Sequence, residues 1–512
     1  MKLKAKFMDI QAGETLVAIL NKEDADELGL KAVDRVRLST DDRNIVAILD
    51  VATETVKRGE VGLYLDLKKY LGEPEDVDLV PAEKPKSVRY ITDRIRGRML
   101  QASEHREIVR DVIDRSLSSL EIAAFITSLE MRPLSIDEAE AITRAMVDLG
   151  QVLEWGRHPI FDKHSIGGVP GDKTTMLLVP TVASLGFMIP KTSSRAITSP
   201  AGTADRVEIL CPVELEIEEI KRVVAKTGGC MVWGGAVDLA PADDLFIQVE
   251  YPLHIDPLYL PSVLGKKKAA SADYVVIDLP TGKGAKLSTV EEANEFGQDF
   301  IRLGKKLGMK VQCGITFGEQ PLGNNVGPAL EAREALETIM GIKSTPDLVV
   351  KVASLTSILL GMNGVENAKE RALEAISSGK AEKKMRQIIG EQGGNPEVMP
   401  DDIPVGEHTL EVPSKNSGEV FWVNNHQVVS LARSLGTPKH RGAGICLPKK
   451  MGDDVEEGDT ILKLFADKAS RLSKAEKILE DMEPVMVAGN LSDRVLIREV
   501  LEVPETPFIL ER

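Results

Sequence analysis

A short glycine-rich turn, residues 165–172, has the composition of an anion site. Its sequence, SIGGVPGD, contains three glycines that allow the backbone to approach a bound phosphate closely. The run that follows from Asp172 is expected to begin a helix, and the free amides at a helix N-terminus attract anions. Lys163 and Lys173 would add positive charge, and Ser165 would add a hydroxyl donor. The turn therefore predicts phosphate binding.

A second donor-rich turn, within residues 193–203, follows after one apolar run. Its donors and small residues are Ser193, Ser194, Arg195, Thr198, Ser199, Gly202 and Thr203. Two such turns suit a substrate with two anionic or hydroxylated parts, whereas either turn alone is more simply interpreted as an ordinary loop. An ATP-binding P-loop is rejected, because it requires Gly-Lys-Ser/Thr after its spacer and this chain has Gly-Asp-Lys-Thr.

An acid and a lysine farther along the chain complete the candidate site. Asp256 lies in PLHIDPLYLP, among apolar residues and prolines. Burial would raise its pKa, as a general acid at neutral pH requires, whereas a solvated loop aspartate is the ordinary alternative. Lys286, in PTGKGAKLS, would hold a phosphate or ribose hydroxyls, or else be an exposed loop lysine. The lysine run at 266–268 is by itself typical of a solvated helix face.

Four predicted domains position these residues. Short apolar runs between turns predict a β-rich, barrel-like N-terminal domain, and two capping boxes, Ser118 with Glu121 and Ser135 with Glu138, predict a helical domain. Alternating strands and helices predict a central α/β domain, followed by a C-terminal α+β domain. The boundaries are 1–84 for the N-terminal domain, 88–155 for the helical domain with completion by about 240–272, 156–404 for the phosphate-binding α/β domain apart from that insertion, and 405–512 for the C-terminal domain. The predicted fold class is multidomain α/β and α+β.

The bulk composition agrees with a soluble metabolic enzyme and discriminates little beyond that. The chain has 512 residues, of which 43% are hydrophobic, so it can bury large cores. A net charge of −16 argues against nucleic-acid binding, and local lysines would have to attract an anionic substrate. Four widely spaced cysteines suggest neither zinc nor disulfides. The chain shows no signal segment and no apolar run near twenty residues, so we expect a cytoplasmic protein without membrane contact.

The second turn carries a family pattern, SxRxxxxxxGTxDxxE, which stands here as Ser193, Arg195, Gly202, Thr203, Asp205 and Glu208. With this pattern, the chain from about residue 88 onward resembles the thymidine and pyrimidine nucleoside phosphorylase family. The N-terminal extension, SPAGTAD in the second turn and VWGGAVDLAPADD at 232–244 make it most similar to the archaeal, AMP-cleaving branch of that family. The resemblance implies that AMP and inorganic phosphate react to free base and ribose 1,5-bisphosphate, a pentosyl transfer in nucleotide salvage or degradation that needs no metal or organic cofactor.

The resemblance also implies roles for single residues. Asp256 would be the proton donor to the leaving base. The implied phosphate contacts are Lys163, Ser165 and Ser193. The implied AMP contacts are Gly168, Ser194, Arg195, Ala196, Ile197, Thr198, Ser199, Thr203, Ser262 and Lys286. Lys266 would contact the base. In this mechanism phosphate attacks C1′ while Asp256 protonates adenine, and the helical and α/β domains close over the substrate as a hinge.

One departure from the family bears on the substrate. Pyrimidine phosphorylases carry a base-reading arginine before the serine and lysine that correspond to Ser262 and Lys266, but this chain has no arginine between Arg222 and Arg302. The departure argues against a pyrimidine nucleoside as substrate, while CMP and UMP stay open as additional nucleotides. The alternatives are a pyrimidine nucleoside phosphorylase, a magnesium-dependent enzyme like anthranilate phosphoribosyltransferase, and a non-catalytic AMP sensor. Related phosphorylases form dimers, so a homo-oligomer of at least two copies is expected.

Overall fold

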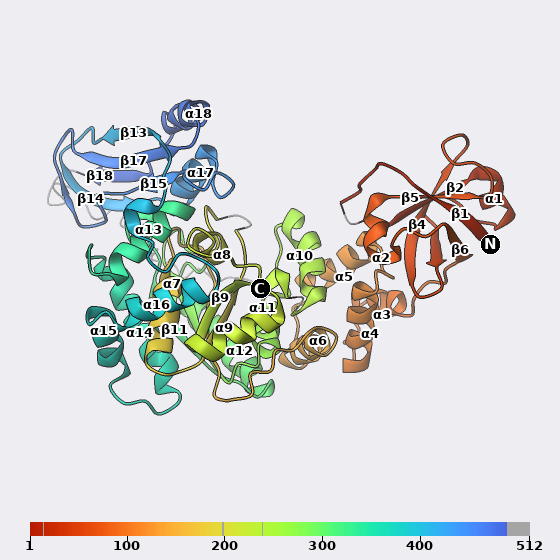
Figure 1. Ribbon diagram of the computed structural model, residues 1–512, viewed down its shortest axis with the longest axis horizontal. Helices are drawn as coiled ribbons and strands as arrows, with labels where there is room; N and C mark the ends of the chain where they lie inside the picture. The colour runs from red at the N-terminus through yellow and green to blue at the C-terminus, as the bar shows by residue number, and fades with distance from the viewer. Residues whose placement is uncertain (14, 197–198, 238, 489–512) are drawn as a thin grey trace, which may run out of the picture.

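The N-terminal domain and the C-terminal domain lie at opposite ends of the molecule, with the helical and α/β parts between them (Figure 1). This computed structural model describes residues 1–13, 15–196, 199–237 and 239–488. The mixed α/β architecture with separate helical and α/β parts confirms the predicted fold class at that level. Within the described residues, no helix is both long and apolar enough to span a membrane.

The N-terminal domain contains a closed barrel with strand order β1-β5-β2-β4-β3-β6. The strands are β1 (Lys2–Phe7), β2 (Val17–Asn21), β3 (Arg35–Ser39), β4 (Asn44–Ala52), β5 (Glu60–Leu63) and β6 (Asp76–Pro81), and the short helices are α1 (Lys22–Glu27), η1 (Leu65–Leu67) and α2 (Lys68–Leu71). Alternate residues of β3, such as Val36 and Leu38, point into a fully buried core, as a half-buried strand requires. The Arg35 guanidinium pairs with the Glu121 carboxylate of the helical part, which ties the barrel to its neighbour.

Six helices form the helical bundle, and two of them come from a later stretch of the chain. They are α3 (Ser87–Ile95), α4 (Ala102–Ile113), α5 (Ser119–Met131), α6 (Ile136–Asp148), α10 (Pro241–Leu253) and α11 (Tyr259–Ala269). Both predicted capping boxes are confirmed, because Ser118 and Ser135 each accept from the amide three residues on, at the starts of α5 and α6. Phe246 of α10 and Leu258 share one core with Phe125 of α5. The late helices therefore complete the bundle.

Parallel strands form the centre of the α/β domain. The sheets are β11-β10-β7 and β8-β9, and a parallel bridge between Ile160 and Met188 places β8 beside β7. The strands are β7 (Phe161–Ser165), β8 (Ile189–Ser193), β9 (Gly229–Trp233), β10 (Tyr274–Thr281) and β11 (Lys310–Phe317). The helices are α7 (Thr174–Ser184), α8 (Thr203–Val207), α9 (Ile217–Thr227), η2 (Gly234–Ala236), α12 (Val290–Lys306), α13 (Pro328–Ile339), α14 (Pro346–Gly361), α15 (Ala368–Ser377), α16 (Lys380–Glu391) and η3 (Pro400–Asp402).

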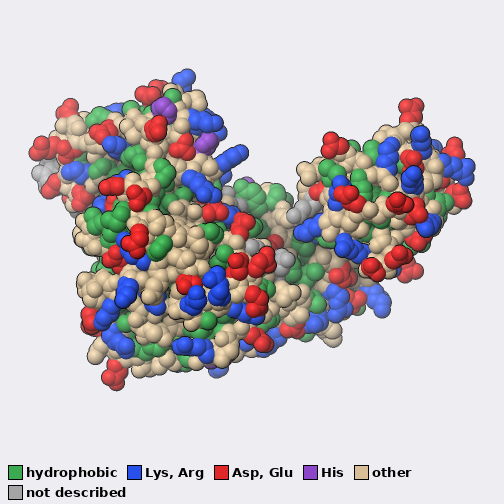
Figure 2. Space-filling view, viewed as in Figure 1, with side chains coloured by type: hydrophobic (Ala, Val, Ile, Leu, Met, Phe, Trp, Pro, Cys, Tyr) green, Lys and Arg blue, Asp and Glu red, His purple; other side chains and the backbone are tan. Residues whose placement is uncertain are grey.

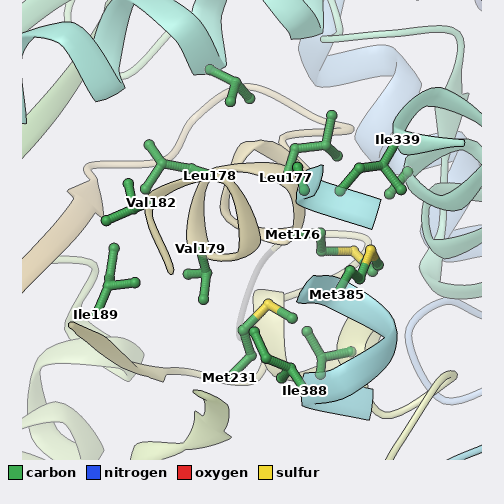
Figure 3. Close-up of a cluster of buried hydrophobic side chains, with 14 of the residues drawn as sticks. Met176, Leu177, Leu178, Val179, Val182, Ile189, Met231, Ile339, Met385 and Ile388 are labelled. Carbon is green, nitrogen blue, oxygen red and sulfur yellow. The ribbon is translucent and has the colours of Figure 1, made fainter. Parts of the chain in front are cut away.

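Helix α7 is the apolar run between the two donor-rich turns, and it lies at the centre of this domain's core. Its side chains, among them Leu177, are buried nearly all round, as expected for a helix without a polar face. Figure 3 shows them facing Ile189 of β8, Met231 of β9 and Ile388 of α16. A fully buried helix holds the turns at its two ends in fixed positions.

As far as Ala488, where the described residues end, the C-terminal domain combines two small antiparallel sheets with two helices. Its elements are β13 (His408–Pro413), β14 (Gly418–Val423), α17 (Asn425–Leu435), β15 (Gly444–Cys446), β16 (Asp454–Val455), β17 (Thr460–Ala466), α18 (Ala469–Leu479) and β18 (Val485–Ala488). One sheet has the order β12-β15-β17-β13, and its strand β12 (Asn325–Val326) precedes α13 of the α/β domain. This shared strand joins the C-terminal domain firmly to the α/β domain.

Candidate active site

The carboxyl ends of the parallel strands bring the two predicted turns to one edge of the sheet. Strands β7 and β8 run side by side and end at Ser165 and Ser193, respectively. Crevices outside the carboxyl ends of parallel strands are the usual ligand sites of open α/β sheets. Figure 2 shows acidic and basic side chains mixed over the face in view, so the positive charge for an anion must come from within this edge.

The first turn contacts the loop that carries Lys286. Gly168 has a φ of +89°, and a Cβ added to it would lie 2.7 Å from the Lys286 amide nitrogen. Only glycine combines this conformation with this close approach. The structure therefore joins two loops that the sequence analysis singled out separately.

Helix α7 begins at Thr174, as the first turn predicts, but its N-terminus is partly capped from within the chain. The Thr174 amide donates to Asp172 Oδ1 at 3.1 Å, so fewer amides are free for an anion than expected. Two buried hydroxyl oxygens, Thr174 Oγ1 and Ser193 Oγ, have no hydrogen-bond partner among the described residues. Ser193 was predicted as a phosphate contact, whereas Thr174 was not predicted.

The structure corrects the expectation for Lys173. Its side chain is fully buried, and its Nζ lies 2.7 Å from the Leu322 carbonyl oxygen and 2.8 Å from Glu334. The ammonium is therefore part of the domain core, and its charge is already neutralised by a carboxylate.

Lys163 belongs to a buried cluster of charged residues beneath the first turn. It is 2% exposed, and its Nζ lies 3.9 Å from Asp172. The neighbouring Asp162 carboxylate is shared by Lys191 at 3.4 Å and Lys267 at 2.8 Å. Burial lowers the pKa of Lys191 well below its ordinary value, although Asp162 opposes that shift. The buried lysines therefore lie at β7 together with Asp162 and Asp172, whose carboxylates balance much of their positive charge.

His164 is held neutral beside this cluster. Burial lowers its pKa well below the ordinary value, and the nearby lysines lower it further. Its Nε2 lies 3.4 Å from the Tyr259 hydroxyl. A neutral imidazole in contact with Tyr259 links β7 to helix α11 of the bundle.

The second turn is held by carboxylates that follow it in the chain. The Arg195 guanidinium donates to Glu208 at 2.8 Å and to Glu214 at 2.8 Å, and it lies 5.1 Å over the Trp233 ring. Asp205 Oδ2 accepts from the amides of Ala196 and Gly202, at 2.7 and 2.8 Å. These contacts fix the shape of the turn. In the structure, the guanidinium of Arg195 therefore stabilises the conformation of the turn.

The other residues of this turn that were predicted to contact AMP lie next to these hydrogen bonds. Ser199 Oγ donates to the Ala201 carbonyl, and Thr203 Oγ1 accepts from Arg206. Ser194 is exposed, and its carbonyl oxygen accepts from the Ala204 amide at 3.3 Å. Ile197 and Thr198 lie outside the described residues. The assignment of this turn to AMP stays a prediction.

Asp256 and Lys286 form a pair across the bundle and the α/β domain. Asp256 Oδ2 lies 3.5 Å from Lys286 Nζ, which lies 3.8 Å from the centre of the Tyr259 ring. Burial raises the pKa of Asp256 even though Lys286 lowers it. The side chain is still 46% exposed, so its apolar enclosure is only partial. A partly open acid beside a lysine is accessible to a substrate.

Ser262 and Lys266 meet on a buried carboxylate that the sequence analysis missed. Asp243 Oδ2 accepts from Ser262 Oγ at 2.8 Å and from Lys266 Nζ at 2.7 Å. Asp243 is fully buried, and its Oδ1 has no partner among the described residues. Both predicted residues are therefore oriented by Asp243 at the start of α10, and Lys266 Nζ also lies 3.7 Å from Asp244. A signal existed in the sequence APADD, where Pro241 and two acids mark a helix start.

A second acid near Asp256 was also missed. Glu250 of α10 is 4% exposed and accepts from the Leu258 amide at 3.4 Å. Burial, with the charges of Asp256 and Asp243, raises its pKa to about 8. Nothing in FIQVEYPL distinguishes this glutamate from a solvated one, because its burial depends on how the bundle packs. With its pKa raised to about 8, the Glu250 carboxyl group is protonated at neutral pH.

Replacing Glu250 with glutamine is expected to make stability less dependent on pH between about 5 and 8. Because the pKa of Glu250 is raised, the folded chain keeps a proton on this carboxyl group at pH values where the unfolded chain has released it. In the unfolded chain the release occurs at the ordinary glutamate pKa, 4.5. This one group therefore lowers the free energy of unfolding by about 1.4 kcal/mol for each pH unit in that interval. Urea unfolding of both proteins across these pH values measures the two slopes. Glu291→Gln, on the surface of α12, is the control, and equal slopes in Glu250→Gln and the unchanged protein would contradict the assignment.

Comparisons with known proteins agree with this architecture. Residues 88–150 match the helical bundle domain of the glycosyl transferase family, and residues 157–382 match its a/b domain. Anthranilate phosphoribosyltransferase from Thermus thermophilus has a similar fold, with a TM-score of 0.50, 19% identity, and coverage of 59% of this chain and 98% of that chain. At this identity the likeness concerns the fold alone. Fold and sequence thus define the class, a glycosyl transferase with a helical bundle and an a/b domain.

Curated relatives match over nearly the whole length of the chain. The AMP phosphorylase of Thermofilum pendens is 44% identical, with 100% of both chains covered. The AMP phosphorylase of Thermococcus sibiricus is 46% identical over 97% of this chain and 99% of its own, and that of Pyrococcus furiosus is 46% identical over 96% and 98%. The chain belongs to the AMP phosphorylase family. The family resemblance stated from the sequence is therefore confirmed.

Proposed function

We propose that the chain is a pentosyltransferase that cleaves AMP with inorganic phosphate, releasing adenine and ribose 1,5-bisphosphate. The observation that carries this proposal is the 44% identity to an AMP phosphorylase over all of both chains, which includes the N-terminal barrel. The geometry supports the proposal. The donor-rich first turn contacts the loop of Lys286 at Gly168, and Lys286 in turn lies beside Asp256.

The reaction is a displacement at C1′ of the ribose. Phosphate, held by Lys163, Ser165 and Ser193, attacks C1′, so a C1′–O bond forms while the bond from C1′ to the base breaks. Asp256 gives its proton to the departing adenine, which would otherwise leave as a poor anion. The Asp256 carboxylate that results is stabilised by Lys286, 3.5 Å away. Positioning and cationic charge supply most of the rate enhancement.

Closure of the bundle onto the α/β domain is part of this proposal. The chain crosses between these domains in segments that are tied to one another: the Leu153 amide donates to Ala269 at 2.8 Å, and Trp155 Nε1 donates to Ala270 at 2.8 Å. Tied crossings of this kind suit a hinge that brings Asp256 toward the phosphate edge. The proposal also includes the domain boundaries given above. We further propose that the protein forms a homo-oligomer of at least two copies and that it is located in the cytoplasm.

Base release from AMP, adenosine and thymidine, each with and without inorganic phosphate, tests the function. Phosphate-dependent release of adenine from AMP, with little from adenosine or thymidine, is the expected result. Release from thymidine in preference to AMP would instead identify a pyrimidine nucleoside phosphorylase. Tight AMP binding without any turnover would identify a sensor, and both of these outcomes would overturn the proposal.

A further inference from the structure

The loop that carries Lys286 is a tight turn rich in glycine. The Gly282 amide donates to Leu287 at 3.0 Å, and the Ala285 amide donates to Gly282 at 3.0 Å. Glycines at 282 and 284 both have positive φ values, +127° and +85°. Glycine-rich loops of this kind have many alternative conformations unless neighbouring groups hold them.

The C-terminal domain stabilises this loop through one buried side-chain amide. Asn425, the first residue of α17, is 1% exposed, and its Nδ2 donates to the Gly318 carbonyl at 2.8 Å and to the Gly284 carbonyl at 3.4 Å. These two carbonyls belong to different segments, the residue after β11 and the middle of the Lys286 loop. Asn425 therefore joins the loop to the end of the central sheet.

A second contact from the same domain lies one residue along the loop. Lys283 Nζ lies 3.4 Å from the centre of the Trp422 ring on β14, which is a close cation–π contact. On its other side, the loop lies against Gly168 of the first turn, where the Lys286 amide nitrogen occupies the space that a Cβ would need. The loop is thus held between the phosphate edge and the C-terminal domain.

We propose that Asn425 is a positioning residue for Lys286, through which the C-terminal domain sets the geometry of the active site. This inference rests on the role of Lys286 given under the proposed function. Asn425 Oδ1 is buried with no partner among the described residues, so the net contribution of this amide to stability is small. What the side chain adds is the pair of donated bonds, which aligns the loop so that Lys286 faces Asp256.

A double-mutant cycle in the full-length protein tests the proposal. Asn425→Ala is expected to lower kcat/KM for AMP phosphorolysis by about tenfold to a hundredfold, because a misplacement near 1 Å has effects of this size. In a chain that already carries Lys286→Ala, the same change should have almost no further effect, because the residue acts through Lys286. Steady-state kinetics of the four proteins, with AMP and phosphate varied separately, give the coupling.

Asn424→Ala is the matched control. Asn424 is the neighbouring asparagine, but its Oδ1 caps α17 by accepting from Gln427 at 3.3 Å, and among the described residues its side chain makes no hydrogen bond to the loop. We expect this variant to lower Tm by a few degrees and to leave kcat/KM unchanged. If Asn425→Ala folds poorly, Trp422→Leu removes the other contact with the loop and should show the same dependence on Lys286 with a smaller loss.

The outcomes separate this inference from the function on which it rests. Full additivity of Asn425→Ala and Lys286→Ala, or kinetics of Asn425→Ala equal to those of Asn424→Ala, would overturn the positioning role while leaving the phosphorylase intact. Unchanged kinetics of Lys286→Ala alone would overturn the assigned role of Lys286, and the inference with it. A loss in Asn425→Ala that disappears in the Lys286→Ala chain supports the proposal.

Discussion

Asp256→Asn is expected to lower kcat for AMP phosphorolysis by about 10²- to 10⁴-fold, the usual contribution of a positioned general acid. Asparagine has nearly the same shape but cannot give a proton to the leaving adenine, so AMP binding should persist while turnover is lost. The raised pKa of Asp256 adds a second signature. In the unchanged protein the rate should fall at high pH as this carboxyl ionises, and the variant should lack that limb of the profile.

Steady-state kinetics over a range of pH, with AMP affinity measured by calorimetry, separate these effects. Asp299→Asn is a suitable control, because Asp299 is a similarly exposed acid, 39% against 46%, and lies on α12 in contact with Arg302. The control should keep the unchanged rate. Turnover of Asp256→Asn within a few-fold of the control would show that another group is the acid, and the protonated Glu250 would then be the first to test.

Lys173→Met is expected to lower the free energy of unfolding by about 3–5 kcal/mol, because it takes the buried cation away from a buried carboxylate and leaves only a partly exposed lysine near it. Lys173 and Glu334 are both fully buried and lie 2.8 Å apart. Glu334 also accepts from the amides of Asn324 and Asn325, at 3.0 and 3.1 Å, so it cannot turn away toward solvent. Urea unfolding of the α/β domain measures the loss.

Two further variants make this result specific. Lys343→Met removes the other, 39% exposed cation, 3.4 Å from Glu334, and should change stability by less than about 1 kcal/mol. Glu334→Gln, added to Lys173→Met, keeps an acceptor for the amides but removes the unpaired charge, so it should restore part of the stability. Equal losses in Lys173→Met and Lys343→Met would mean that the buried pair is not the source.

Local signals allowed much of the framework to be predicted. A capping box such as Ser118 with Glu121 operates within one helical turn, so the start of a helix can be read without knowing its surroundings. The apolar run of α7 likewise identifies a buried helix, since no polar face is left for solvent. The donor-rich turns at its ends were found because glycine and hydroxyl residues cluster in sequence there.

Residues whose roles depend on distant contacts could not be predicted in this way. Lys173 stands next to the glycine turn, yet its partner Glu334 is far along the chain, so the sequence indicated an anion ligand where the fold has a core ion pair. Glu250 and Asp243 become buried only when α10 packs into the bundle. Asn425 belongs to no motif, because its donated bonds join segments that only the folded chain brings together.

The bundle contains helices that precede β7, β8 and β9 in the sequence and helices that follow them. This order along the chain has a consequence for synthesis on the ribosome. Helices α3 to α6 emerge first, but the apolar surface around Phe125 stays open until Phe246 of α10 arrives, with the two rings 6.2 Å apart in the finished core. The barrel, in contrast, is one continuous stretch and can close as soon as β6 has emerged. Nascent chains that stop before α10 should therefore hold a folded barrel beside an incomplete, chaperone-dependent bundle.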